Sequence, residues 1–299
     1  MKRRYWLLSL IPLGLGLIPA VYFWFISAHN PVAFLRIDLG TLALLLGLGL
    51  SAILGAVIAL RTVLEQRRLA LFAQAADERR RFLRRLDHEL KNPLTAIRAG
   101  LANLAGSPSE SARQEALLSV DAQAQRLSRL AADLRKLAEL EIRLVEHAPV
   151  DIPALLQEVF TLAQDQPGAS ERRLSLSIPK APWPLPKVSG DSDLLFLAVH
   201  NLLENALKFS RPGDTVELHA FEDGTSLLIE IADTGPGIPA EEHPHVFEEL
   251  YRGEAGRGIP GSGLGLALVR AIAERHNGQV SLRSRPGQGT VFTLRLPVG

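Results

Sequence analysis

The sequence predicts three structural parts: a membrane domain of two transmembrane helices, an α-helical hairpin that forms a dimeric four-helix bundle, and a C-terminal α+β sandwich. Three observations predict them: two long uncharged stretches near the N-terminus, two amphipathic helical patterns after them, and alternating helical and strand-like segments towards the C-terminus. The expected boundaries are 1–60 for the membrane domain, 61–78 for a juxtamembrane signalling helix, 79–147 for the hairpin and 148–299 for the sandwich.

The two uncharged stretches cover residues 5–27 and 39–60. Each is long enough to cross a bilayer, which takes roughly 20 residues in a helix. A cleaved signal peptide is the alternative for the first stretch, but its apolar run exceeds the usual length of about 7 to 15 residues. We therefore predict two transmembrane helices.

Basic residues around these stretches predict the orientation. They lie before the first stretch and after the second, at Lys2, Arg3, Arg4, Arg61, Arg67 and Arg68. The loop between them, 28–38, has Arg36 as its single Lys or Arg. Because basic residues are retained on the cytoplasmic side, both termini are expected in the cytoplasm. Residues 61–100 hold ten Lys or Arg against five Asp or Glu, which favours contact with anionic membrane lipids.

The composition argues against several classes of function. A net charge of +1, from 33 Lys or Arg and 32 Asp or Glu, disfavours nucleic-acid binding. The chain has no cysteine, so disulfides, thiolate nucleophiles and cysteine-based zinc sites are excluded. The eight histidines show no spacing typical of metal ligands, and we expect no structural metal.

Two amphipathic helices are expected after the membrane domain. The first covers 64–104, with apolar residues at steps of three or four at Phe82, Leu86, Leu90, Leu94, Ile97, Leu101 and Leu104. Turn-forming residues follow at 105–111. The second helix covers 111–144, with residues near heptad spacing at Leu117, Val120, Ala124, Leu127, Ala131, Leu134 and Leu137. Such a hairpin leaves one apolar face uncovered, and a second copy of the chain would cover it.

The first helix carries the decapeptide LDHELKNPLT at 86–95. His88 lies on the face opposite the apolar stripe and is expected to face solvent. Glu89 is adjacent to it, and Asn92 lies four residues on, on the same face as His88. Pro93 removes a backbone N–H and predicts a kink. A nucleophile with an acid–base group and an amide beside it indicates a reaction site.

The C-terminal part is expected to pack helices on one face of a mostly antiparallel sheet. Helices are expected at 152–164, 191–209 and 263–277, and strands at 172–178, 215–221, 226–233, 279–284 and 289–296. Asp223-Gly224 predicts a β-hairpin turn between the second and third of these strands.

Three glycine clusters lie in this part: DTGPGIP at 233–239, GSGLGLALV at 261–269 and PGQGT at 286–290. The second leads directly into an expected helix, whose N-terminal N–H groups suit phosphate. No Walker-type sequence occurs, and the first cluster opens no Rossmann-type helix, so P-loop and dinucleotide-binding folds are disfavoured.

The expected helix 191–209 carries NLLENALKF, in which Asn201 and Asn205 lie one turn apart. Glu204 and Lys208 lie beside them. Oxygen ligands can share Mg²⁺ with phosphates, and an ammonium group adds positive charge. A solvated polar helix face is the alternative, but the three glycine clusters favour a binding site.

Together these motifs resemble those of bacterial two-component sensor histidine kinases. LDHELKNPLT is similar to the H box of that family, NLLENALKF to its N box and DTGPGIP to its first glycine box. VFEELYRGE, at 246–254, is similar to the F box, and GSGLGLALV and GQGT are similar to the second and third glycine boxes. The six motifs occur in the order of the family and cover residues from about 80 to 299.

The resemblance implies a Bergerat-type ATP-binding domain, of the kind found in DNA gyrase and MutL. It implies that Asp233 contacts the adenine amino group, with help from Gly237 and Thr290. Further nucleotide-binding positions implied by the same motifs are Gly235, Gly261, Gly263, Leu264 and Gly265.

The resemblance also implies that Mg²⁺ accompanies ATP. Asn205 would hold the ion, with Asn201 as a second candidate ligand, and Lys208 would lie near the phosphates. A mobile lid between the first two glycine clusters would be anchored by Phe247, and Arg252 in it would reach the γ-phosphate.

The implied reaction is phosphorylation of His88 by ATP, with Glu89 and Asn92 as assisting catalytic residues. The phosphoryl group would pass to an aspartate of a cognate response regulator, and the protein would also dephosphorylate that regulator. The implied protein is a multi-pass homodimer in the bacterial cytoplasmic membrane. Whether His88 is phosphorylated by its own subunit or by the partner subunit depends on the handedness of the hairpin loop, which the sequence leaves open.

The short distance between membrane and His88 bears on sensing. The 27 residues at 61–87 are too few for a relay domain of this family, so we expect intramembrane sensing through the spans or an accessory membrane protein. An ATP-gated membrane binding module without kinase activity is one alternative. A gyrase–MutL-type ATPase using Glu204 is another. The presence of His88, Asn205 and Asp233 favours the kinase.

Overall fold

A computed structural model describes residues 39–106, 109–142, 145–179, 184–256, 258–259 and 261–298. The first expected membrane span, 5–27, and the loop at 28–38 lie outside these residues. Within them, one helix, Gly47–Leu104, is long and apolar enough to cross a membrane by length and composition. The described residues therefore contain a candidate for one of the two expected spans.

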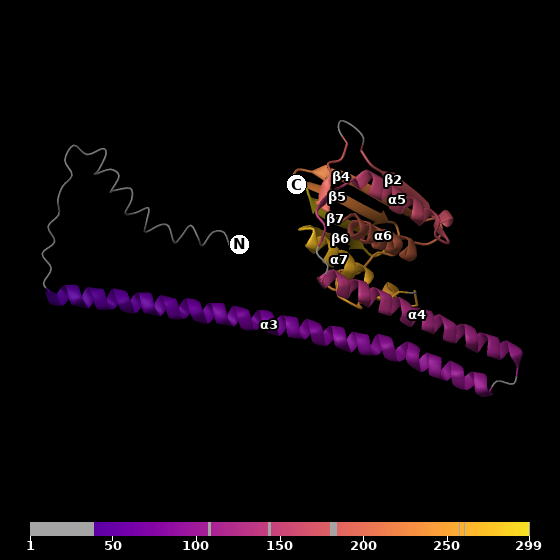
Figure 1. The fold of residues 1–299 in the computed structure, drawn as a ribbon, viewed down its shortest axis with the longest axis horizontal. Helices are drawn as coiled ribbons and strands as arrows, with labels where there is room; N and C mark the ends of the chain where they lie inside the picture. The colour runs from indigo at the N-terminus through magenta and orange to yellow at the C-terminus, as the bar shows by residue number, and fades with distance from the viewer. Residues whose placement is uncertain are drawn as a thin grey trace. The chain divides into compact units, whose positions relative to one another are not determined.

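Two helices, α3 (Leu39–Gly106) and α4 (Glu110–Ile142), form the expected hairpin (Figure 1). α3 is helical on both sides of Pro93, the residue at which the sequence predicts a kink. A proline removes one backbone hydrogen bond, and the turns on both sides keep theirs, so the helix persists. The side chain of Pro93 is buried, which compensates in part for the missing bond.

The two helices approach closely at Gly100. A Cβ atom added there would lie 2.6 Å from Cγ2 of Val120 on α4, so the contact requires a residue without a side chain. The prediction that His88 faces solvent is confirmed, since its side chain is exposed. Leu94 and Leu101 of the apolar stripe remain 49% and 52% exposed, so the single chain leaves part of the stripe uncovered.

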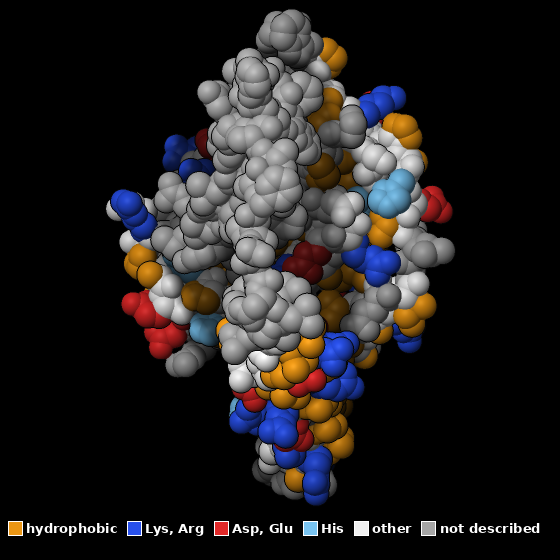
Figure 2. Space-filling model, turned by 90° about the vertical axis from the view of Figure 1, so that its left-hand side faces the viewer, with side chains coloured by type: hydrophobic (Ala, Val, Ile, Leu, Met, Phe, Trp, Pro, Cys, Tyr) orange, Lys and Arg blue, Asp and Glu red, His pale blue; other side chains and the backbone are white. Residues whose placement is uncertain are grey.

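The basic segment that follows the expected span 39–60 is open to solvent. Arg61, Arg67 and Arg68 of α3 are exposed, as are the apolar side chains of Leu69 and Phe72 among them. Figure 2 shows such blue Lys and Arg side chains interleaved with orange hydrophobic ones in the lower part of the view.

The rest of the chain is an α/β sandwich, as the sequence predicts. Its helices are α5 (Ile152–Gln164), α6 (Ser192–Phe209) and α7 (Gly265–Arg275), with short 3₁₀ turns η2 (Ala169–Glu171) and η3 (Glu254–Gly256). Its strands are β1 (Ala148–Val150), β2 (Arg173–Ser177), β3 (Val188–Gly190), β4 (Thr215–Asp223), β5 (Ser226–Asp233), β6 (Gln279–Arg285) and β7 (Gly289–Pro297).

The main sheet has the strand order β2-β4-β5-β7-β6. The pair β2–β4 is parallel and the other pairs are antiparallel. The sequence missed β1 and β3, which pair with each other over three residues each, too short a stretch to show periodicity. The predicted turn was wrong by one residue: Asp223 pairs with Ser226, so the two loop residues are Gly224 and Thr225.

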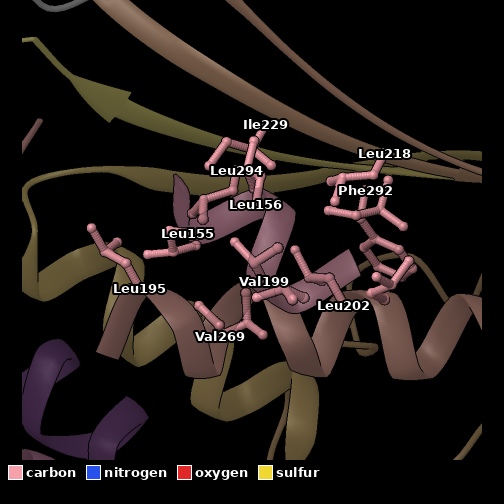
Figure 3. Packing of buried hydrophobic residues seen from close by; sticks show 14 of the residues in the cluster. Leu155, Leu156, Leu195, Val199, Leu202, Leu218, Ile229, Val269, Phe292 and Leu294 are labelled. Atoms are coloured by element: carbon pink, nitrogen blue, oxygen red, sulfur yellow. The ribbon is translucent and has the colours of Figure 1, made fainter. Parts of the chain in front are cut away.

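The core lies between the sheet and the three helices. Figure 3 shows Leu155 and Leu156 of α5, Val199 and Leu202 of α6, and Val269 of α7 packed beneath strand residues such as Ile229 and Leu294. Most of these side chains are fully buried. Burial of each such side chain contributes roughly 1.5–3 kcal/mol, which holds the helices in place on the sheet.

The ends of α6 and α7 are joined through a buried histidine. Asp191 caps α6 by accepting hydrogen bonds from the N–H groups of Asp193 and Leu194. The Asp191 N–H donates to Nε2 of His276, which is 2% exposed, at 3.0 Å. The other ring nitrogen lies 2.8 Å from the carbonyl oxygen of Ile272. The neutral imidazole satisfies both partners, and burial lowers the pKa of His276.

Candidate active site

A cavity of about 700 Å³ opens beside α6. It is lined by residues of α4, α6, the end of β5, the segment 236–263, the start of α7 and the start of β7. Its volume suits a small organic ligand. Ten of the residues predicted to bind nucleotide line it: Asn201, Asn205, Lys208, Asp233, Gly237, Arg252, Gly261, Gly263, Gly265 and Thr290.

Asp233, the last residue of β5, lines the cavity and is 8% exposed. Its Oδ1 accepts a hydrogen bond from the N–H of Gly235 at 2.8 Å. Burial raises the pKa of Asp233, and the backbone N–H groups of Gly235 and Thr290 act in the opposite direction. The Gly235 bond fixes the orientation of the carboxylate at the end of the strand.

Asn201, Asn205 and Lys208 project from the polar side of α6. The Nδ2 of Asn201 donates to the carbonyl oxygen of Leu197 at 2.8 Å, so its Oδ1 faces the N-terminus of α7. Burial lowers the pKa of Lys208; Arg252 and Arg129 lower it further, and Glu204 and Asp133 oppose them. The amide oxygen and the ammonium group thus face the same volume.

The second glycine cluster forms the opposite side of that volume. Gly263 has a φ of 74°, and a Cβ atom there would lie 2.8 Å from the carbonyl oxygen of Tyr251. A Cβ atom on Gly261 would collide with the ammonium group of Lys208, and one on Gly265 would lie 3.0 Å from Oδ1 of Asn201. The free N–H groups at the start of α7 therefore lie beside the amide and the ammonium, which is an arrangement suited to phosphate.

Three of the predicted residues lie just outside the cavity lining. Phe247 packs edge-on against Phe292, with ring centroids 6.2 Å apart, which attaches the segment 236–263 to the core. Gly235 orients Asp233, and Leu264 is buried against the hairpin.

Arg252 lines the cavity but is engaged with its own segment. Its guanidinium donates to the carbonyl oxygens of Gly256 and Ile259 at 2.5 and 2.6 Å. In this arrangement the side chain of Arg252 stabilises the loop around η3, and it would have to leave these carbonyls to reach a bound phosphate.

His88 lies outside the cavity, on α3. The side-chain amide of Asn92 contacts Nδ1 of the His88 ring at 3.1 Å, one turn along the helix. Nε2 of His88 has no hydrogen-bond partner among the described residues. Glu89 forms an ion pair with Arg126 of α4 at 2.7 Å, a partner that sequence reasoning missed because it comes from the other helix of the hairpin.

The hairpin and the sandwich are in contact within one compact unit, Ala75–Gly299. Leu250 and Leu264 of the sandwich pack with Leu130 of α4, and Phe82, Leu86 and Leu134 surround them. Leu250 has a φ of 57°, a conformation that costs an L-residue roughly 1–2 kcal/mol and is offset by burial of its side chain, which is 4% exposed.

Polar contacts surround this apolar centre. Arg85, one turn before His88, forms an ion pair with Glu248 at 2.6 Å and lies over the ring of Tyr251. Burial raises the pKa of Glu248, but hydrogen bonds from His245 and Arg85 outweigh it and hold the pKa below its ordinary value. The hydroxyl of Ser262 donates to Asp133 of α4 at 2.6 Å. No sequence signal identified the contacts of Arg85 and Ser262, because each joins residues more than 100 positions apart.

Comparisons with known proteins agree with this arrangement. Residues 78–142 match the His Kinase A (phospho-acceptor) domain, and residues 190–299 match the histidine kinase-, DNA gyrase B-, and HSP90-like ATPase. The alginate biosynthesis sensor protein KinB of Pseudomonas aeruginosa is 34% identical over 82% of this chain and 40% of KinB. The signal transduction histidine-protein kinase/phosphatase MprB of Mycolicibacterium paratuberculosis is 32% identical over 77% of this chain and 45% of MprB. The chain spans about half the length of the curated relatives it matches.

Two solved structures share the fold. Full-length ShkA in complex with AMPPNP has a TM-score of 0.53 and 28% identity, over 71% of this chain and 44% of ShkA. Histidine kinase ThkA in complex with response regulator protein TrrA has a TM-score of 0.59 and 18% identity, over 73% of this chain and 61% of that chain. With a phospho-acceptor domain followed by an ATPase domain, this chain belongs to the two-component sensor histidine kinases.

Proposed function

We propose that the protein is a membrane-bound sensor histidine kinase that phosphorylates His88 with ATP and passes the phosphoryl group to an aspartate of a response regulator. The observation that carries this proposal is the pairing of two sites in one compact unit. One is an exposed histidine with an amide on one ring nitrogen, and the other is a cavity with groups for both ends of ATP.

In this proposal adenine binds at Asp233, the buried carboxylate in the lining of the cavity. The triphosphate extends toward Lys208 and the N-terminus of α7. Two features support this direction: the buried acceptor suits an amino group, and the ammonium and helix N–H groups suit anions. The alternative of an ATP-gated module without kinase activity would need no nucleophile near α4, whereas His88 has an exposed imidazole on the helix that pairs with α4.

The residues at the phosphate end fit Mg²⁺. Amide oxygens of Asn201 and Asn205 are the hard ligands that Mg²⁺ prefers, and this ion is usually held by few protein groups together with substrate phosphates. Among the described residues no three His, Asp or Glu side chains form a site that would hold a metal by themselves. When bound with ATP, Mg²⁺ would neutralise charge on the β- and γ-phosphates.

The chemistry at His88 follows from its contacts. The lone pair of Nε2 attacks the γ-phosphorus, the new N–P bond forms, and the bond to the bridging oxygen of ADP breaks. The attacking neutral ring carries its proton on Nδ1, where the Asn92 amide, turned to present its oxygen, would hold it. Glu89, beside the ring, would then accept the Nδ1 proton once it has left Arg126.

A response regulator and a second copy of the chain are the proposed partners. The exposed apolar side chains of Leu94 and Leu101 support a four-helix bundle between two hairpins. The name of MprB describes that protein as a kinase/phosphatase, and ThkA was solved with a regulator. We extend both properties to this chain, with Glu89 and Asn92 positioning water for dephosphorylation of the regulator.

Localisation in the bacterial cytoplasmic membrane, with two spans and both termini cytoplasmic, is also part of the proposal. The candidate span and His88 belong to the same helix, α3. A change in the span would therefore be transmitted along that helix without an intervening domain. This supports intramembrane sensing, either by the spans or through an accessory membrane protein.

The test is incubation of the full chain in detergent micelles with γ-labelled ATP and Mg²⁺. We expect acid-labile, alkali-stable label on the wild type and none on His88→Gln. Asn92→Ala serves as a second variant that keeps the nucleophile and should slow labelling. Label that survives His88→Gln would overturn the assignment of the phosphorylation site, and absence of any label on the wild type would overturn the kinase itself.

A further inference from the structure

The cavity has a wall that does not belong to the ATPase domain. Four polar side chains of α4 line it, at Arg126, Arg129, Asp133 and Lys136. Their spacing of three and four residues places them on one face of the helix. They face a volume that also contains Lys208.

Two contacts hold this wall against the second glycine cluster. The hydroxyl of Ser262, within the cluster, donates to Asp133 at 2.6 Å. Leu264, which is 1% exposed, packs in one cluster with Leu130 of α4. The wall is therefore anchored beside the loop that carries the phosphate-binding N–H groups.

Most cations around the cavity already have protein partners. Arg126 pairs with Glu89, and Arg252 donates to two carbonyl oxygens of its own loop. Within the described part of the chain, Arg129 and Lys136 have no hydrogen bond or ion pair, and both are exposed toward solvent. Arg129 lies close enough to Lys208 for the two like charges to affect each other.

An anion bound between Arg129 and Lys208 would relieve the repulsion between their positive charges. The triphosphate of ATP is polyanionic, and the planar guanidinium of arginine suits bidentate contact with phosphate. On the proposed assignment of the ATP site, the phosphates would lie between α6 and the wall on α4.

We propose that Arg129 binds the phosphates of the nucleotide, so that ATP is held between the ATPase domain and the second helix of the hairpin. This inference rests on the proposed ATP-binding function of the cavity. Lys136, about two turns further along α4, supplies a second positive charge in the lining of the same cavity. Because coupling is reciprocal, bound nucleotide also stabilises the contact between hairpin and ATPase domain.

The test measures nucleotide affinity of the full chain in detergent micelles, by calorimetry with AMPPNP, ADP and AMP. Arg129→Gln should weaken AMPPNP binding about tenfold, the size expected for loss of one charge-assisted hydrogen bond. ADP should be affected less and AMP hardly at all. Arg113→Gln is the matched control, since Arg113 is on the same helix, pairs with Glu110 and does not line the cavity. It should leave all three affinities unchanged.

The outcomes distinguish a failure of the inference about Arg129 from a failure of the proposed function. If the wild type binds AMPPNP and Arg129→Gln binds it equally well, Arg129 is a solvated surface charge and this inference is wrong. Equal weakening for AMPPNP, ADP and AMP would also contradict it, because that pattern reports damage to the fold. If the wild type binds no nucleotide, the proposed function itself fails.

Discussion

The contact between Gly100 and Val120 makes a prediction in which two effects oppose each other. Gly100→Ala removes the entropic penalty of glycine in a helix, which alone would stabilise α3 by about 0.5–1 kcal/mol. The new Cβ atom, however, would lie 2.6 Å from Cγ2 of Val120 and 3.6 Å from the carbonyl oxygen of Ala116. Carbon atoms in ordinary contact are about 3.5–4.0 Å apart, so about 1 Å of displacement is needed.

Val120 cannot easily provide that displacement. A β-branched side chain in a helix has one strongly preferred rotamer, so the helices must separate instead. Overpacking of this kind costs about 1–3 kcal/mol, which exceeds the gain in helix propensity. We therefore expect Gly100→Ala to lower the free energy of unfolding by up to about 2 kcal/mol.

The assay is guanidinium unfolding of the full chain in micelles, followed by helical circular dichroism. Val120→Ala removes the Cγ2 atom that the new Cβ atom would strike. Adding Gly100→Ala to Val120→Ala should therefore lower the free energy of unfolding much less than adding it to the wild type. If Gly100→Ala is more stable than the wild type, the helices are not in contact at this point and the reasoning fails.

Three further predictions concern other contacts. Because burial holds the native pKa of His276 below about 6.5, its unfolded value, the unfolded state binds more protons as the pH falls below that value. Stability should therefore fall between pH 7.5 and 5.5 in urea titrations, and His276→Gln should reduce this dependence; an equally steep fall in the variant would contradict it. Arg85→Ala and Glu248→Ala should together show a coupling of about 1 kcal/mol in a double-mutant cycle of unfolding, since both side chains are about a quarter exposed; simple additivity would mean that the pair is not formed in solution. Pro93→Ala restores one backbone N–H beside the reaction site and should change the ratio of kinase to phosphatase activity, measured with a phosphorylated regulator; an unchanged ratio would count against a role for Pro93 in switching.

Local patterns were sufficient for most elements of the fold. Asp151 and Asp191 are N-caps at the predicted starts of α5 and α6, and the apolar periodicity between caps and breakers located both helices within one residue. Short strands such as β1 and β3 escaped prediction because three residues cannot show a period. The helix α3 continues through Pro93, because a single proline removes only one backbone hydrogen bond.

In the candidate site, too, local sequence patterns predicted some features and could not predict others. The sequence alone identified the candidate residues for the chemistry, because His88, Asn205, Asp233 and the glycines belong to local motifs whose spacing depends on helix and turn geometry. Only the tertiary structure decided which residues of other elements contact the site. Arg126 pairs with Glu89, Ser262 donates to Asp133, and Arg129 lines the same cavity as Lys208. These pairs join separate elements, and their geometry arises from packing of the hairpin against the ATPase domain, which leaves no periodic trace in the sequence.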